Sequence, residues 1–411
     1  MADNHAGSVK RGTWLLAARN LALAGTALMV TLLLCELLLR LLGVHYPVYV
    51  WTDPLRGIAH IPGARGGDRD DNGRPWIQIN RDGMRGPETP LQHTPGTLRI
   101  ALLGDSFIEA FEVPFDSTVG QVMARRLSAL RGAPVEVLNF GTGGYGTTQE
   151  LLTLRNQVWK YTPDLVLLAV TTGNDITDNY QPLSQGSYRP YYVYQGQELV
   201  LDTSFLETKA YRSRAMWTRR LLKVVQRSSL IQLINRVRHA SRRSERQQQN
   251  MAGSIQGDEL GLRDEVQLPP VTDDWREAWR VTEGLLRMMR DECRSRHTPF
   301  ALVTLTRGTQ VTPVRAQKES TLRQLGVPDL FYPDRRLAEF GLQEGIPVLN
   351  LAPSMAVEAE QRQVYFHANG DSLGIGHWNS AGHLAAGERI AAWLAGELAG
   401  EIKAPRPAAA R

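Results

Sequence analysis

Cysteine is scarce in this chain of 411 residues, which contains only Cys35 and Cys293. Cys35 lies inside a long apolar segment near the N-terminus, so we expect no bond between the two. Two isolated cysteines provide neither a disulfide framework nor the ligand set of a zinc site. Both classes are therefore excluded. The hydrophobic content of 42% and the charged content of 22% are ordinary for a globular protein.

The long apolar segment covers residues 21–42, LALAGTALMVTLLLCELLLRLL. A helix needs about 20 residues to cross a bilayer, so this segment is long enough. Glu36 and Arg40 interrupt it, but they are spaced to pair on one helical face near its C-terminal end. A cleaved signal peptide is the main alternative, but no cleavage site with small residues follows. A soluble amphipathic helix would need a polar face, which residues 21–35 lack. We predict an uncleaved transmembrane anchor over residues 14–43.

Basic residues indicate how this anchor is oriented. Lys10, Arg11 and Arg19 precede the apolar segment, and fewer basic residues follow it closely. The positive-inside rule then places residues 1–13 in the cytoplasm as a short tail. We predict a single-pass protein of the inner (cytoplasmic) membrane whose main domain is periplasmic or extracellular. Nucleic acid is not an expected partner of a domain outside the cytoplasm, even though the net charge is +5.

Residues 44–97 are rich in Gly, Pro, Arg and Asp. A short strand is expected at residues 76–79, followed by a turn at Asp82 and Gly83. We interpret residues 44–97 as a lead-in subdomain that packs on the main domain, and they contain no recognisable chemistry of their own.

Strands alternate with helices over residues 98–402. The expected strands are residues 100–103, 135–140, 165–170, 300–305 and 347–351. The expected helices are residues 117–131, 148–160, 274–296, 334–344 and 380–399. This alternation predicts an α/β domain with a parallel sheet covered by helices on both faces.

A long insertion, residues 178–272, interrupts this alternation, and its part from 211 to 246 is expected to be a strongly basic helix. Its basic residues are Arg212, Arg214, Arg219, Arg220, Lys223, Arg227, Arg236, Arg238, Arg242, Arg243 and Arg246. An apolar stripe accompanies them, formed by Leu222, Val225, Leu233, Ile234 and Val237. Such a helix suits an anionic membrane surface or an acidic polymer, or it packs on the domain by its stripe. Residues 403–411 are expected to be a disordered tail.

The apolar run at residues 100–103 ends at Gly104, and Asp105 and Ser106 follow before a helical segment. A short apolar run bounded by glycine is typical of a strand buried in a parallel sheet. Ligands bind outside the carboxyl ends of such strands. The N-terminus of a helix also favours developing negative charge, so the Ser106 hydroxyl is well placed as a nucleophile. Asp105 or Ser106 as a simple helix cap is the alternative.

A glycine-rich segment, NFGTGGYGT, covers residues 139–147 directly after an expected strand. Gly141, Gly143 and Gly146 formally match the dinucleotide fingerprint G-x-G-x-x-G. That fingerprint also needs an acidic residue at the end of the next strand, where Thr171 and Thr172 stand instead. We therefore disfavour nucleotide binding. A glycine-rich turn also brings backbone N–H groups close to a ligand, as an oxyanion hole requires.

Two further polar groups stand at loop positions. Asn174 closes the third expected strand and offers an amide donor, although Asn also favours turns on its own. His377 precedes the last expected helix and is a candidate base for Ser106. His377 and His383 as metal ligands are disfavoured because no third ligand has a useful spacing. The sequence predicts no metal and no cofactor.

Four sequence motifs follow one another along the chain. They are residues 104–107, the glycine-rich turn around Gly144, residues 173–175 and residues 377–379 before the last helix. This order and spacing resemble the SGNH (GDSL-type) hydrolase family over residues 98–402, and similar relatives include membrane-anchored bacterial proteins. The α/β-hydrolase pattern G-x-S-x-G does not match. The resemblance implies a flavodoxin-like three-layer fold and carboxylic-ester chemistry.

The resemblance also implies residue roles. Ser106 is the expected nucleophile and His377 the general base. The backbone N–H groups of Ser106 and Gly144, with the side chain of Asn174, are the expected oxyanion hole, and Gly143 replaces Gly144 if the turn is offset by one residue. The family's orienting acid is missing from its usual place, two or three residues before the histidine. Asp371 is the nearest candidate; without it, Ser106 and His377 form a dyad.

We therefore predict a serine esterase that acts on O-acyl esters of an envelope or extracellular polysaccharide or of a lipid. The two alternatives are an O-acyltransferase that acts on a glycan and a non-catalytic envelope component that binds polysaccharide. The sequence does not indicate the oligomeric state.

Overall fold

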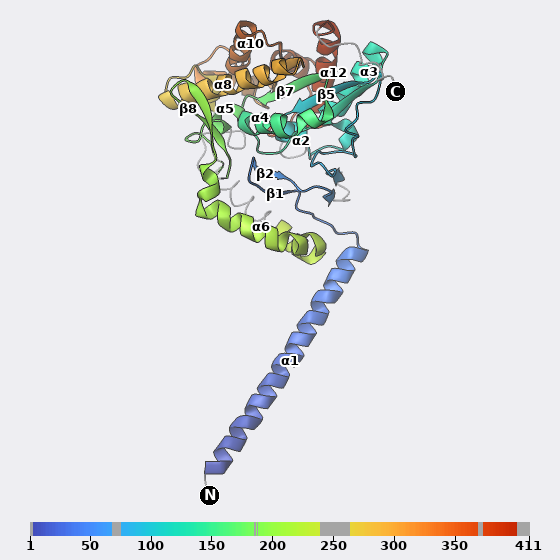
Figure 1. Ribbon diagram of the computed structural model, residues 1–411, viewed down its shortest axis with the longest axis vertical. Coiled ribbons are helices and arrows are strands. Elements are labelled where there is room, and N and C mark those ends of the chain that lie inside the picture. Colours follow the sequence, from blue (N-terminus) through green and yellow to red (C-terminus); the bar gives the residue numbers. More distant parts are fainter. Residues whose placement is uncertain are drawn as a thin grey trace.

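The computed structural model describes residues 3–67, 75–184, 186, 188–238, 264–368 and 373–400. A long N-terminal helix, α1 (Asp3–Leu41), extends away from a folded domain, and the described C-terminal end of the chain lies on that domain (Figure 1). The predicted tail at residues 403–411 lies outside the described residues.

A five-stranded parallel sheet forms the centre of the folded domain. Its strands are β5 (Leu98–Leu103), β6 (Val135–Asn139), β7 (Leu165–Thr171), β10 (Phe300–Leu305) and β11 (Val348–Asn350), in the order β11-β10-β7-β5-β6. Numbered along the chain, this order is the 2-1-3-4-5 of flavodoxin-like folds. Every residue of β5, β7 and β10 is buried, as in a sheet covered on both faces. The predicted α/β class and parallel sheet are confirmed.

Helices cover the two faces of this sheet. One core contains side chains of α3 (Val119–Arg131), α11 (Ala352–Arg362) and α12 (Ser380–Gly396). The other contains side chains of α4 (Thr147–Asn156), α8 (Asp273–Ser295) and α10 (Tyr332–Glu344). Successive residues of β5 alternate between the two cores, because side chains of a strand point to opposite faces in turn. The result is a three-layer domain.

Two helices of the domain were not expected from the sequence. Helix α9 (Arg315–Leu325) buries none of its residues, so it lacks the apolar periodicity by which helices are recognised. Helix α11 begins directly after β11, and its apolar residues are mostly alanines. The shorter helices are α2 (Ser106–Glu109), α5 (Asp175–Asp178), η1 (Phe115–Ser117), η2 (Val158–Tyr161), η3 (Ser204–Glu207) and η4 (Asp264–Gln267).

The lead-in residues form two small antiparallel pairs. Strand β1 (Val50–Asp53) pairs with β2 (Gly57–His60), and β3 (Arg65–Gly66) pairs with β4 (Ile77–Gln78). Strand β4 falls within the expected strand at residues 76–79. In Figure 1, β1 and β2 lie between the main domain and α6 (Lys209–Arg227).

The insertion contains a hairpin of β8 (Tyr191–Gln195) and β9 (Glu198–Asp202), followed by α6. Helix α6 ends at Arg227, and the chain is helical again over residues 229–238. The expected basic helix over residues 211–246 is therefore divided into two helical segments within the described residues. The break occurs at Ser228, whose side chain accepts a hydrogen bond from the backbone N–H of Ile231 at 3.2 Å and so caps the second helical segment. Residues 239–246 lie outside the described residues.

Helix α1 contains a segment, Ala17–Leu41, that is long and apolar enough to cross a membrane. None of its most apolar stretch is buried against the rest of the protein. An apolar N-terminal helix of this kind is consistent with a membrane anchor or with a signal sequence.

Candidate active site

Ser106 lies at the carboxyl edge of the sheet, at the start of α2. Strand β5 ends at Leu103, and the Asp105 side chain caps α2 by accepting a hydrogen bond from the Phe107 N–H at 2.9 Å. Gly104 is required at this turn, because a Cβ there would lie 2.4 Å from the Cγ1 atom of Ile108. Asp105 thus provides the cap, and the Ser106 hydroxyl is left for another role.

His377 lies beside Ser106, although 271 residues separate them along the chain. The Nε2 atom of His377 is 2.7 Å from the Oγ atom of Ser106, which is a hydrogen-bond distance. His377 belongs to the loop that precedes α12, in agreement with its position in the sequence. The fold therefore brings together the two side chains that the sequence paired.

Glu112 holds the other nitrogen of the same ring. Its Oε1 atom lies 2.8 Å from the Nδ1 atom of His377, and the two side chains are 41% and 34% exposed. Glu112 was not expected from the sequence, because the family's orienting acid stands two or three residues before the histidine, whereas Glu112 follows the nucleophile by six residues. The sequence candidate Asp371 lies outside the described residues. The signal for Glu112 is a carboxylate close to Ser106, in the turn that follows the short helix α2.

His377 and Glu112 each shift the pKa of the other. Burial lowers the pKa of His377, but the hydrogen bond and negative charge of Glu112 outweigh it, so the net shift is upward. Burial likewise disfavours the charged form of Glu112, but its hydrogen bond with His377 lowers the pKa of Glu112 overall. A carboxylate therefore faces Nδ1 and stabilises a proton on that side of the ring, which leaves Nε2 free to accept one.

The loop that carries His377 is fixed by its neighbours. His367 and Trp378 form an isolated antiparallel bridge, and both side chains bond to the Thr306 hydroxyl at 2.8 Å. The Phe107 ring packs edge-on against the His377 ring, with 5.1 Å between centroids. These contacts restrict the orientation of the imidazole relative to Ser106.

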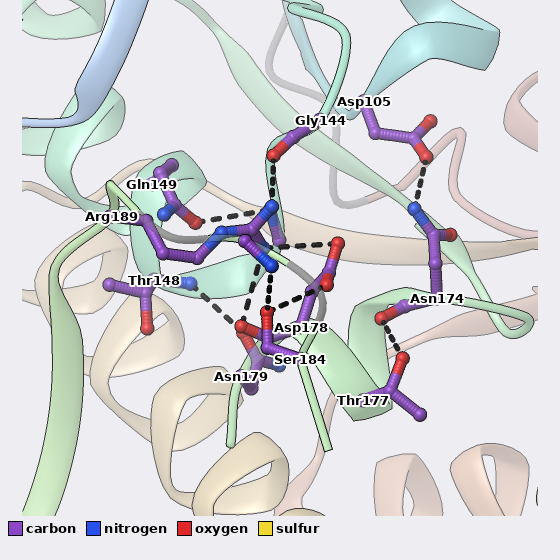
Figure 2. A network of polar contacts seen from close by, with 12 residues as sticks. Asp105, Gly144, Thr148, Gln149, Asn174, Thr177, Asp178, Asn179, Ser184 and Arg189 are labelled. Atoms are coloured by element: carbon purple, nitrogen blue, oxygen red, sulfur yellow. Dashed lines mark hydrogen bonds and ion pairs between the residues drawn. The ribbon is translucent and has the colours of Figure 1, made fainter. Parts of the chain in front are cut away.

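The three predicted oxyanion donors come from three different loops. Ser106 is the first residue of α2, where backbone N–H groups have no acceptor within the helix. The Asn174 side chain donates a hydrogen bond to the Oδ2 atom of Asp105 at 3.1 Å, which ties it to the residue before Ser106 (Figure 2). Gly144 adopts a φ of 79°, a conformation that favours glycine.

The turn at Gly144 is held by a polar network (Figure 2). Arg189 donates a hydrogen bond to the Gly144 carbonyl at 2.9 Å and pairs with Asp178 at 3.0 Å. The backbone N–H of Gly146 donates to the side chain of Gln149 at 3.1 Å. The bond from Arg189 fixes the Gly144–Tyr145 peptide, which directly follows the peptide that carries the Gly144 N–H.

The glycine-rich segment packs against α2. A Cβ at Gly141 would lie 2.5 Å from the backbone nitrogen of Glu109, and one at Gly143 would lie 2.8 Å from the Oε2 atom of Glu109. The Asn139 side chain donates a hydrogen bond to the Ile108 carbonyl at 2.7 Å. These glycines therefore permit close contact with the helix that carries Ser106, which explains their spacing without a nucleotide.

The lead-in subdomain supports the other end of α2. The Nε2 atom of His60, at the end of β2, lies 2.6 Å from the Oε1 atom of Glu109. The buried Arg85 side chain donates hydrogen bonds to the carbonyls of Glu109, Ala110 and Val113. Residues 44–97 therefore contribute to the placement of Ser106, a role that the sequence did not indicate.

Three buried carboxyl groups lie behind the site. They belong to Asp105, Glu150 and Asp175, all of which are inaccessible to solvent. Burial raises the pKa of each, and the charge of Asp105 adds to the shift of Glu150. The backbone N–H of Thr171 donates a hydrogen bond to Asp175 at 2.7 Å. This part of the core thus favours neutral carboxyl groups.

His383, the second histidine considered from the sequence, lies in α12 and not beside Ser106. Its Nδ1 atom accepts a hydrogen bond from the Val119 N–H at 3.2 Å, and burial lowers its pKa to about 3, so the ring is neutral. Among the described residues, no three His, Cys, Asp or Glu side chains are grouped to hold a metal ion.

No protein-family model matches this chain, and no curated protein matches it in sequence. Solved structures with a similar fold include an acetyl xylan esterase, with 10% identity, coverage of 71% of this chain and 98% of that chain, and a TM-score of 0.36. A lipase/acylhydrolase from Enterococcus faecalis has 14% identity, coverage of 75% and 99%, and a TM-score of 0.34. A catalytic mutant of an acetylxylan esterase from Geobacillus stearothermophilus has 9% identity, coverage of 72% and 93%, and a TM-score of 0.36.

Proposed function

We propose that this protein is a serine esterase of the SGNH type that hydrolyses carboxylic esters through an acyl-Ser106 intermediate. The observation that carries the proposal is the chain of contacts from the Ser106 hydroxyl to His377 and on to Glu112. A hydroxyl, an imidazole and a carboxylate in this order are the parts of a nucleophile activated by an oriented general base.

The acylation step follows from these contacts. The Ser106 oxygen attacks the acyl carbon of the ester while its proton moves to the Nε2 atom of His377. The carbonyl oxygen becomes negatively charged, and the donors at Ser106, Gly144 and Asn174 stabilise it. When the intermediate collapses, the bond to the alcohol oxygen breaks and His377 returns the proton to the departing alcohol. The acyl group remains on Ser106.

Deacylation repeats these events with water. His377 takes a proton from a water molecule, the resulting hydroxide attacks the acyl carbon, and Ser106 leaves with the proton from His377. The carboxylic acid is released. Glu112 stays ionised throughout and stabilises the imidazolium that forms in each half-reaction. His377 and Glu112 are partly exposed, so water can reach the imidazole that activates it.

The membrane-anchored, extracytoplasmic placement predicted from the sequence is part of the proposal, with α1 as an uncleaved anchor. The ester then belongs to an O-acylated glycan or a lipid of the envelope, since these are the acylated molecules that such a domain reaches.

A fluorophosphonate probe tests the proposal because it reacts only with an activated serine. We expect the wild type to be labelled and Ser106→Ala to be unlabelled, whereas Ser320→Ala, at an exposed position in α9, keeps full labelling. Loss of p-nitrophenyl acetate turnover should accompany loss of labelling. Unlabelled wild type, or turnover unchanged in Ser106→Ala, would exclude the proposed role. An acylated glycan formed in excess over free acid would identify a transferase instead.

A further inference from the structure

The basic insertion lies at the end of the apolar helix. In Figure 1, α6 runs across the direction of α1, and one end of α6 lies beside the C-terminal end of α1. Helix α1 ends at Leu41, and the chain returns to the same place at residues 227–232. A helix that runs across the end of α1 is placed to lie along the surface of a bilayer that α1 crosses.

Glu36 joins the two parts. Its carboxylate accepts hydrogen bonds from the Ser228 hydroxyl at 2.9 Å and from the backbone N–H groups of Ser229 and Leu230 at 3.0 Å. It therefore caps the start of helical residues 229–238, where unpaired N–H groups favour an anion. Arg40 pairs with Glu36 at 2.7 Å and donates a hydrogen bond to the Arg227 carbonyl. The two charges that interrupt the apolar segment thus have a structural role.

Further contacts hold the insertion against the residues after α1. The Gln232 side chain accepts a hydrogen bond from the Tyr46 N–H at 2.8 Å, and the Arg236 guanidinium lies 3.9 Å from the centre of the Tyr46 ring. Gln226 donates a hydrogen bond to the Val48 carbonyl. The insertion is therefore bound to α1 and to the lead-in segment at several points.

The exposed side chains of this unit combine large apolar groups with basic ones. Met216, Trp217 and Leu221 of α6 are 45%, 56% and 44% exposed, and Ile234 is 50% exposed. The exposed basic residues include Arg212, Arg214, Arg227 and Arg238. Exposed tryptophan and leucine beside arginine are typical of a helix at the level of lipid headgroups. An acidic polymer would engage the arginines but would not need the apolar side chains.

We propose that α6 and residues 229–238 lie on the surface of the bilayer that α1 crosses, with their apolar side chains at headgroup depth and their arginines on anionic lipid phosphates. Glu36 fixes this unit to α1. The proposal rests on the membrane anchor but not on the ester chemistry. Helix α2 lies on the side of the domain that faces β1, β2 and α6 (Figure 1).

The test uses the full-length protein in lipid nanodiscs with an environment-sensitive nitrobenzoxadiazole probe. The probe is attached at Trp217→Cys in a Cys35→Ser background, because Cys293 is buried. We expect lipids brominated near the headgroup to quench this probe and its emission to shift to the blue. The matched control is the same probe at Ser320→Cys, on exposed α9, which we expect to remain unquenched.

Two variants separate the roles of Glu36 and of the basic residues. Glu36→Leu removes the acceptors of the three hydrogen bonds from residues 228–230 and should abolish quenching at position 217. Glu36→Gln keeps one acceptor oxygen, so its quenching should fall between that of Glu36→Leu and that of the wild type. Thr31→Val on the same helix should leave quenching unchanged.

Arg227→Gln with Arg238→Gln should reduce the difference in quenching between phosphatidylglycerol and phosphatidylcholine nanodiscs. Circular dichroism establishes that each variant is folded.

An unquenched probe at position 217 in anionic nanodiscs would overturn the proposal. So would equal quenching at positions 217 and 320, or a probe that responds to a soluble acidic polysaccharide and not to lipid. Each of these results is independent of fluorophosphonate labelling at Ser106, so the failure of this inference and of the esterase proposal can be distinguished.

Discussion

At the scale of single residues, the candidate site depends on one imidazole with a different partner on each nitrogen. Ser106 lies 2.7 Å from Nε2 of His377, and Glu112 lies 2.8 Å from Nδ1. Glu112 selects the tautomer of the ring and raises the pKa of His377 against the effect of burial. The rate and the pH dependence of the proposed reaction are therefore linked through Glu112.

Glu112→Gln should lower ester turnover by a factor on the order of 10²–10⁴, because the ring loses the charge that stabilises its protonated form. The base must be neutral to accept a proton, so activity rises with pH through the pKa of His377. Removing Glu112 lowers that pKa, and we expect the midpoint of the acid limb to move to lower pH. The measurement is kcat/KM against pH for p-nitrophenyl acetate.

Asp371→Asn is the matched comparison, since Asp371 was the sequence candidate for the same role. A larger loss of activity in Asp371→Asn than in Glu112→Gln, or an unmoved acid limb in Glu112→Gln, would argue against the assignment of Glu112.

The buried carboxyl groups give a stability prediction. The pKa of Glu150 is raised in the folded protein, so the folded protein keeps the Glu150 proton at pH values above 4.5. The unfolded chain, in which Glu150 has its ordinary pKa of 4.5, releases that proton. The free energy of unfolding therefore falls as pH rises above that value, by up to about 1.4 kcal/mol per pH unit for one proton. Glu150→Gln should flatten this dependence in urea titrations at several pH values. Glu277→Gln, in a partly exposed ion pair, should not. An unchanged slope in Glu150→Gln would contradict the prediction.

At the scale of elements, α2 is held between the glycine-rich segment on one side and the lead-in subdomain on the other. Gly141 contacts its backbone so closely that any Cβ would overlap Glu109 and Ile108. His60 and Arg85 bind its C-terminal end. The position of Ser106 is thus determined by parts of the chain that carry no chemistry themselves.

Gly141→Ala should destabilise the protein by about 1–3 kcal/mol, the usual cost of overpacking, and should displace α2. We expect a lower midpoint of urea unfolding together with weaker fluorophosphonate labelling. Gly396→Ala is the control, because nothing lies within 4 Å of a Cβ there and alanine favours a helix. Normal labelling and stability in Gly141→Ala would show that α2 does not depend on this contact.

The elements also show what the sequence could and could not predict. Strands β5, β7 and β10 are short apolar runs in a fully covered sheet, so composition alone located them. Helix α9 buries nothing, and its exposed face left no apolar pattern to detect. The second cap at residues 228–230 depends on Glu36 of α1, and the role of Glu112 depends on a contact with His377. Long-range contacts of this kind leave no local signal.

At the scale of the whole molecule, the chain has two parts of different character joined by the lead-in segment. Helix α1 is apolar and stands away from the domain, whereas the domain is an ordinary three-layer structure (Figure 1). The basic insertion is the part of the domain that contacts α1. The proposed topology places α1 in the membrane and the sheet outside the cytoplasm.

Thiol labelling of intact cells tests this topology. In a Cys35→Ser background, Ser320→Cys adds an exposed thiol on α9, while burial raises the pKa of the Cys293 thiol and keeps it unreactive. A membrane-impermeant maleimide should label Ser320→Cys in cells whose outer barrier has been opened and whose inner membrane is intact. The background variant should stay unlabelled. Labelling only after the inner membrane is dissolved would place the domain in the cytoplasm.

The 271-residue separation of Ser106 and His377 has a consequence for biosynthesis. A chain still emerging from the ribosome carries the hydroxyl long before it carries the imidazole. The nascent polypeptide is therefore inert toward the esters of the compartment in which translation occurs. Chemical competence arrives only when the His377 loop has been made and α12 packs against α3.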